Sequence, residues 1–109
     1  MSEPATITVT RGPARGQLYE LEAGLVHIGR AESNQVVLED ADLADHHASI
    51  VFRNGRYAIF TPLPDAVSID GSPIPPQRWV WLPESAEILL GESTLAYFSR
   101  VASSGGGAP

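Results

Sequence analysis

The sequence predicts an all-β domain, a two-sheet β-sandwich of about ten to eleven short strands. Short runs that alternate apolar and polar residues recur along the chain, and β-branched and aromatic residues are common in them. Glycine, proline and asparagine separate these runs, as turns require. With 109 residues, of which 43% are hydrophobic, the chain fits one domain with one modest core.

The first half of the chain contains four runs that fit strands. Residues 6–10 alternate isoleucine and valine with threonine, which is the period of a half-buried strand. Residues 17–21 alternate in the same way after a turn at 12–16, so these two runs are expected to form a hairpin. Apolar runs at 25–28 and 36–38 predict two more strands, separated by a polar turn.

The second half continues the pattern. Residues 48–52 and 57–59 alternate on either side of Asn54-Gly55, a strong hairpin signal because both residues tolerate positive φ. Two prolines in 61–66 predict a loop there and exclude a central strand. The other expected strands are 67–69, 78–82, 84–90 and 95–98.

The two ends of the chain differ from the middle in composition. Residues 1–4 are expected to form an N-terminal tail, and residues 5–101 the folded domain. Residues 102–109 are rich in serine and glycine, so they predict a flexible linker or tail. A linker of this kind indicates that the domain is part of a larger multi-domain protein.

Composition also limits the function. The chain has no cysteine, so it offers neither a disulfide framework nor a cysteine-rich zinc site. Seven arginines, no lysine and thirteen acids give a net charge of −6, which disfavours nucleic acid as a partner. No apolar run approaches the roughly 20 residues needed to cross a bilayer, and the start lacks the features of a signal peptide. We therefore expect a cytoplasmic domain without membrane insertion and without a cofactor.

Two loops in the stretch 24–52 carry the residues best suited to a binding site. Arg30 follows Gly29, which lets the backbone turn sharply, and arginine can fork two hydrogen bonds onto a phosphate or carboxylate. A salt bridge from Arg30 to an acid of its own loops is the alternative. His47 opens the next strand and is expected to orient the loops through its two ring nitrogens.

Short motifs follow one another in a specific order between Thr6 and Phe98. They are Gly16-x-x-Tyr19-x-Leu21 with Gly24, Ile28-Gly29-Arg30, Ser33-Asn34, Val36-x-Leu38, His47-Ala48-x-Ile50, Tyr57, Ile69-Asp70-Gly71-x-x-Ile74 and Ile88-x-Leu90-Gly91. In order and spacing they resemble the forkhead-associated (FHA) domain. The resemblance implies a β-sandwich whose loops at one end bind phosphothreonine peptides.

The resemblance also implies roles for individual residues. Arg30 matches the arginine that grips the phosphate, with Gly29 as its turn partner. His47 matches a structural histidine that organises the loops. The expected phosphopeptide-binding residues are Arg30, Ser33, Asn34 and Asp65.

The chain departs from the FHA pattern in the binding loops. Ala44 and Asp45 stand where the family has serine and usually arginine, and LPDAV at 63–67 replaces the family's Ser-x-Asn-Gly loop. Five acids follow the single Arg30 within the next fifteen residues: Glu32, Glu39, Asp40, Asp42 and Asp45. We therefore expect a protein-protein interaction module in a bacterial protein, with phosphate binding weak or lost. The alternative is a phospho-independent scaffold domain of a secretion or signalling assembly.

Catalysis and metal binding have little support. A hydrolase, the distant alternative, would need Ser33 or Ser49 activated by His46 or His47, and their spacing matches no known motif. We expect that the protein is not an enzyme. Adjacent histidines on a strand point to opposite faces, so the acids and histidines at 42–47 do not predict a metal site.

Trp79 and Trp81 share one face of their expected strand. Packing in the core or at a sheet edge is one interpretation of the pair, and an exposed surface for a partner is the other.

Overall fold

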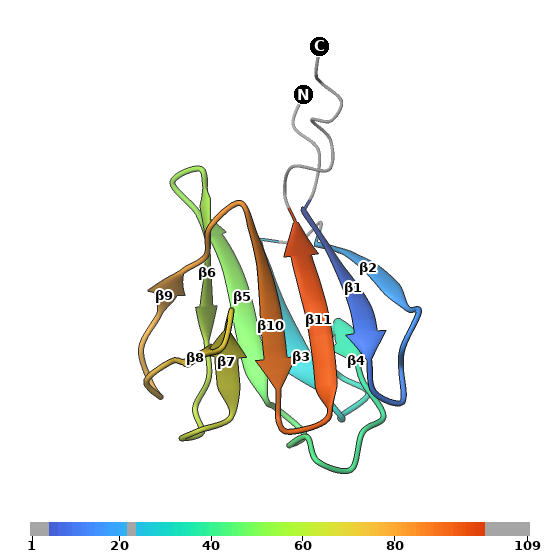
Figure 1. Ribbon diagram of the computed structural model, residues 1–109. Coiled ribbons are helices and arrows are strands. Elements are labelled where there is room, and N and C mark those ends of the chain that lie inside the picture. The colour runs from blue at the N-terminus through green and yellow to red at the C-terminus, as the bar shows by residue number, and fades with distance from the viewer. Residues whose placement is uncertain (1–4, 22–23, 100–109) are drawn as a thin grey trace.

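The computed structural model describes residues 5–21 and 24–99. Eleven strands form two sheets around one core, and no helix occurs in these residues, which confirms the predicted all-β sandwich (Figure 1). A helix able to span a membrane is likewise not found in them. The predicted tails at 1–4 and 102–109 lie outside the described residues.

One sheet has six strands, and the first and last strands of the chain pair with each other in its interior. Ile7 lies opposite Phe98 in this antiparallel pair. In spatial order the sheet consists of β2 (Leu18–Leu21), β1 (Ala5–Arg11), β11 (Thr94–Ser99), β10 (Ser85–Leu90), β7 (Val67–Ile69) and β8 (Ser72–Pro73).

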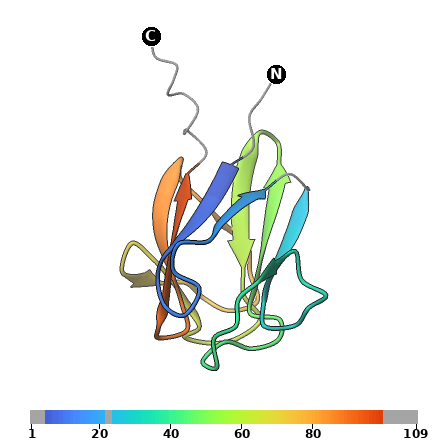
Figure 2. The same cartoon turned by 90° about the vertical axis from the view of Figure 1, so that its right-hand side faces the viewer.

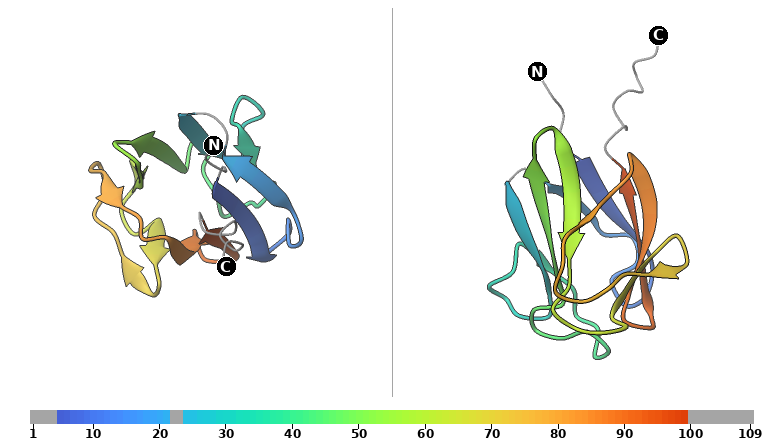
Figure 3. Two further views of the ribbon diagram at one scale, coloured as in Figure 1. Left: turned by 90° about the horizontal axis from the view of Figure 1, so that it is seen from above. Right: turned by 90° about the vertical axis from the view of Figure 1, so that its left-hand side faces the viewer.

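The other sheet has five strands and carries the central loops of the chain. Its strands are antiparallel except that β3 and β4 run parallel. In spatial order it consists of β4 (Val36–Val37), β3 (Leu25–Gly29), β5 (Ala48–Arg53), β6 (Arg56–Phe60) and β9 (Val80–Trp81). Seen from above, the two sheets face each other across the core (Figure 3).

Alternating side chains of both sheets fill the space between them. Isoleucines from both sheets and Phe98 are almost completely buried there, as expected for the inward faces of a sandwich. At one edge of the sandwich, the Tyr19 hydroxyl donates a hydrogen bond to the Val37 carbonyl at 3.2 Å and so joins β2 to β4. Burial raises the pKa of this tyrosine above its ordinary value.

The strands follow the sequence prediction with two differences. The strand expected at 78–82 contains only Val80–Trp81, because a turn with Gln77 at φ 62° delays the entry of the chain into the sheet. Ser72–Pro73 forms a short strand that was not predicted, and it lies at the sheet edge, where proline is tolerated. The Asn54-Gly55 hairpin turn is confirmed, with φ of 56° and 76°.

Candidate functional site

Four loops gather at one end of the sandwich. They connect β3 to β4, β4 to β5, β6 to β7 and β10 to β11, and they lie at the bottom of Figures 1 and 2. β1 begins and β11 ends at the opposite end (Figure 1). A rigid sandwich therefore presents these four loops together, away from the ends of its first and last strands.

Gly29 and Arg30 lie where the first of these loops leaves β3. A Cβ atom on Gly29 would lie 2.7 Å from the carbonyl carbon of Asp45, so only glycine fits against that backbone. The Arg30 amide donates to the Ala44 carbonyl at 3.0 Å, which holds the loops of Arg30 and His47 side by side. The Arg30 side chain is exposed, and within the described residues it forms neither a hydrogen bond nor a salt bridge.

Asn34 and Ser33 occupy the tip of the same loop in different ways. Asn34 is buried, and its side-chain nitrogen donates to the Asp45 carbonyl at 2.7 Å. Its side-chain oxygen is buried without a hydrogen-bond partner in the described part of the chain. Ser33 is exposed. The side-chain amide of Asn34 thus holds two loops together, whereas Ser33 is exposed to solvent.

His47 is buried where three segments meet. Its Nδ1 atom accepts a hydrogen bond from the Ala44 amide at 3.1 Å, so the proton of the neutral ring is on Nε2. Nε2 then donates to the Ala66 carbonyl at 2.9 Å. The His47 amide donates to the Ile28 carbonyl at 2.8 Å. One residue therefore connects the β4–β5 loop, the β6–β7 loop and the end of β3.

The β6–β7 loop is fixed by two further contacts. The Ala66 carbonyl accepts a second hydrogen bond from the Gly91 amide at 2.9 Å. The buried Thr61 hydroxyl donates to the His47 carbonyl at 2.8 Å and accepts from the Leu63 amide at 3.2 Å. This loop is consequently attached both to the β4–β5 loop and to the β10–β11 turn.

Asp40 has a role in the structure that the sequence did not predict. Its carboxylate is buried, accepting from the Thr94 hydroxyl at 2.5 Å and from the Asp42 amide at 2.9 Å. Asp42 in turn accepts from the Ser93 hydroxyl at 2.6 Å. The buried carboxylate of Asp40 therefore links the β4–β5 loop to the start of β11.

A shallow groove of about 490 Å³ runs between these loops. Asp42, Asp65 and Glu92 line it, and no lysine, arginine or serine does. Asp65 is exposed and has a φ of 53°. The other lining residues are Leu43, Ala44, His47, Leu63, Pro64, Ala66 and Gly91. The groove is thus acidic. One of its acids, Glu92, comes from the β10–β11 turn, which no sequence motif connects with the site.

The serine and histidine pairs considered for hydrolysis are arranged differently from that hypothesis. Ser49 lies 2.8 Å from Nδ1 of His27, and the same ring atom lies 3.0 Å from Nε2 of His46. Both ring nitrogens of His47 are occupied by loop backbone, so His47 is not placed to activate a serine. Within residues 5–21 and 24–99, no three acids, histidines or cysteines form a group able to hold a metal.

The arrangement of the sheets and loops is that of known FHA domains. The FHA domain of an Arabidopsis thaliana hypothetical protein matches with a TM-score of 0.83 and 21% identity, over 99% of this chain and 90% of that one. The N-terminal FHA domain of S. cerevisiae Rad53p, in complex with a phosphothreonine peptide, matches at 0.79 and 13%, over 89% and 93%. The FHA domain of the Chlamydia trachomatis CT664 protein matches at 0.76 and 20%, over 88% and 96%. The predicted FHA fold is confirmed.

Within this fold, the sequence itself matches one family. The model of the family described as "Inner membrane component of T3SS, cytoplasmic domain", where T3SS is the type III secretion system, matches residues 8–97. The chain belongs to this family. No match is found among curated proteins.

Proposed function

We propose that this FHA domain is a protein-interaction module of a bacterial secretion assembly. It works in the cytoplasm as part of a larger protein, and its loop end binds phosphothreonine weakly or not at all. The family match supports the secretion assembly, since that family is described as the cytoplasmic domain of an inner membrane component. The Rad53p domain is in complex with a phosphothreonine peptide, which supports phosphothreonine as the class of ligand that this loop end would bind weakly or not at all.

The acidic lining of the loop groove is the observation that carries this proposal. Asp42, Asp65 and Glu92 face the space between the loops, and Ala44 offers a methyl group where FHA domains have a serine hydroxyl. Phosphothreonine carries a charge of about −1.5 to −2 at neutral pH. Two unit charges about 7 Å apart interact by roughly 0.6 kcal/mol in water and about 2.4 kcal/mol at an effective dielectric of 20. An acid at that distance from a bound phosphate opposes it by an amount comparable to one hydrogen bond.

Arg30 is the residue from which residual phosphate binding would come. Its guanidinium is exposed and has no partner in the described part of the chain, so it is free to form charge-assisted hydrogen bonds. In this proposal Ser33 adds a solvent-facing hydroxyl, and Asp65 accepts from the backbone of a peptide. Asn34, Gly29 and His47 act indirectly, because they keep the loops in position.

Titration with phosphothreonine peptides tests the proposal. A library of such peptides and its unphosphorylated counterpart are titrated calorimetrically against the domain, with Arg30→Ala as the variant that removes the exposed cation. We expect affinities poorer than roughly 100 μM for every phosphopeptide, with a small loss in the Arg30 variant. Tight binding that requires the phosphate would overturn the proposed loss of phosphate recognition.

A further inference from the structure

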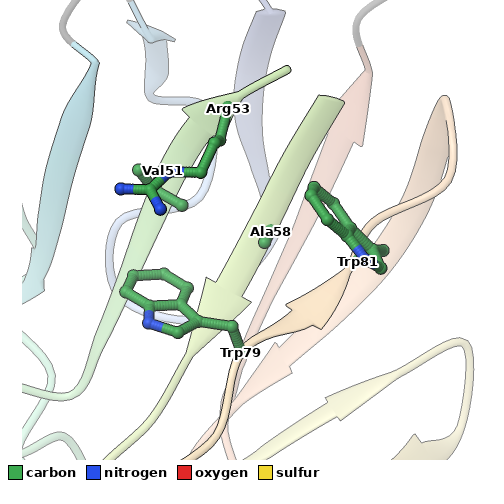
Figure 4. A pocket seen from close by; sticks show the side chains of 5 residues that line it. All are labelled: Val51, Arg53, Ala58, Trp79 and Trp81. Carbon is green, nitrogen blue, oxygen red and sulfur yellow. The ribbon is translucent and has the colours of Figure 1, made fainter. Parts of the chain in front are cut away.

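The outer face of the five-stranded sheet carries a second groove, whose lining differs chemically from that of the loop groove. It has a volume of about 250 Å³ and is lined by Val51, Arg53, Ala58, Trp79 and Trp81 (Figure 4). No acid lines it, although the chain has a net charge of −6. The molecule thus has one acidic groove at its loop end and one aromatic groove with a cation on a sheet face.

The floor of this groove follows from the strand register. Val51 lies opposite Ala58, and Ala58 lies opposite Trp81, so these three side chains form one row across β5, β6 and β9 on the outer face. The small side chain of Ala58 leaves room between larger neighbours, and Figure 4 shows it between the two indoles. An apolar side chain of a partner would find a complementary space there.

Both indoles are held in place before any partner binds. The Trp79 ring packs on Phe60 with 5.1 Å between ring centroids. The Arg56 guanidinium lies 4.3 Å from the centre of the Trp81 ring. Even so, Trp79 is 48% exposed and Trp81 is 45% exposed. Fixed but exposed tryptophans reduce the entropy lost on binding, and tryptophan and arginine are the residues most often found at the energetic centre of interfaces.

The arginines indicate the charge of the partner. Arg53 and Arg56 are directly opposite each other in the β5–β6 hairpin, and like charges in that arrangement destabilise a sheet. Within the described residues, the Arg53 guanidinium has no ion pair to relieve this repulsion. A carboxylate bound beside Arg53 would relieve it and would add charge-assisted hydrogen bonds.

We propose that the groove between Trp79 and Trp81 binds an extended, acidic segment of a partner protein. A large apolar side chain of that segment sits over Ala58 between the indoles, and a neighbouring aspartate or glutamate bonds to Arg53. The inference rests on the proposed function as an interaction module, and it locates the partner contact on a sheet face instead of the loop end. An anionic membrane is the less favoured occupant, because the chain has a net charge of −6 and a single arginine, Arg53, lines the groove.

The chain contains two tryptophans, and both line this groove, so intrinsic fluorescence reports on it directly. The probe is a displayed library of random nine-residue peptides, selected on the wild-type domain and then titrated as synthetic peptides against tryptophan fluorescence. We expect a consensus with acidic residues next to one large apolar residue. Replacing that apolar residue by serine is expected to abolish the fluorescence change.

Two charge-reversal variants distinguish binding at this groove from a general effect of the protein's net charge. Arg53→Glu is expected to weaken binding of the selected peptide at least about tenfold. Arg15→Glu changes the net charge by the same amount at an exposed position of the 12–16 turn, and it is expected to alter the affinity by less than about twofold. Thermal melts of both variants that match the wild type exclude unfolding as the cause.

Several results would overturn the inference. A non-acidic consensus, or peptides whose binding survives Arg53→Glu, would move the interface elsewhere while leaving the domain a peptide-binding module. The absence of any selected peptide would count against both the groove and the proposed function. Binding to phosphatidylglycerol vesicles with a tryptophan response would assign the surface to a membrane. A dimer in sedimentation analysis that Arg53→Glu dissociates would assign it to a second copy of the chain.

Discussion

The Nε2 atom of His47 lies 2.9 Å from the carbonyl oxygen of Ala66, nineteen residues further along the chain. The same carbonyl accepts the Gly91 amide at 2.9 Å, so one peptide group receives hydrogen bonds from two other loops. Because the other ring nitrogen of His47 accepts from the Ala44 amide, the imidazole is a bridge with no unsatisfied nitrogen. The geometry of the loop end consequently depends on this single side chain.

Replacing His47 by alanine is expected to lower the free energy of unfolding by roughly 1–3 kcal/mol. The change leaves the Ala44 amide without its acceptor and removes one of the two donors to the Ala66 carbonyl, in a buried position. Urea unfolding followed by circular dichroism measures the effect. His46→Ala is the matched control, since His46 is exposed, and it should change stability by less than about 0.5 kcal/mol. Equal effects in the two variants would contradict the bridging role.

Gly29→Ala is expected to destabilise the domain by about 1–3 kcal/mol, because the new methyl group would overlap the backbone of Asp45. The obstacle is a peptide group and not the end of a flexible side chain, so relief requires the two loops to separate. Gly24→Ala provides the comparison, as nothing lies within 4 Å of a Cβ atom there. Thermal melts that rank the two variants in the opposite order would show that the loops do not pack as described.

Thr94→Val is expected to cost about 1–3 kcal/mol, although valine has nearly the same shape as threonine. The substitution removes the hydroxyl that donates to the buried carboxylate of Asp40 and leaves one of its oxygens without that partner. Ser93→Ala removes a similar hydrogen bond to Asp42 in an exposed position and should cost under about 0.5 kcal/mol. Chemical denaturation of both variants is the measurement, and a neutral Thr94 variant would be the contrary result.

The fold was predictable from sequence because its signals are local. Alternation at 6–10 and 84–90 marks strands wherever they pair, and Asn54-Gly55 specifies its own hairpin through φ. Alternation alone did not decide whether Trp79 and Trp81 are buried or exposed. Both are exposed, because they lie in and beside the two-residue edge strand β9, where nothing in the described residues covers the outer face of the sheet. The local sequence pattern determines which segments are strands. Whether a side chain on a strand is buried depends on which other segments the fold places next to it.

The site was predictable only in part, because its contacts join distant segments. Asp40 is separated from Thr94 by 54 residues, so nothing beside it in sequence indicates that its carboxylate is buried. Glu92 reaches the groove from the β10–β11 turn for the same reason. Arg30 was left with two interpretations, and among the described residues the salt bridge to a local acid is not formed.

The double substitution Ala44→Ser and Asp45→Arg is expected to create measurable phosphothreonine binding. Ala44 lines the loop groove, so a serine there places a hydroxyl donor in it. Asp45 is exposed, and its carbonyl is held by the Asn34 side chain, so its own side chain is free to change without loss of the loop. The local charge becomes more positive by two units. Together these changes should gain about 1.5–3 kcal/mol, which is roughly ten- to a hundred-fold in affinity.

Calorimetry with phosphorylated and plain peptide on both proteins tests this prediction. Its physical basis is the competition between the hydrogen-bond donors of the loop end and the acids that line the loop groove. Arg30 already supplies one exposed cation, and the two substitutions add a hydroxyl in the groove lining and a second exposed cation. Asp42, Asp65 and Glu92 remain and continue to oppose the phosphate, so the gain should grow at low salt, where screening is weaker. No gain at any salt concentration would mean that the 61–66 loop, fixed by His47 and Thr61, excludes the peptide by shape.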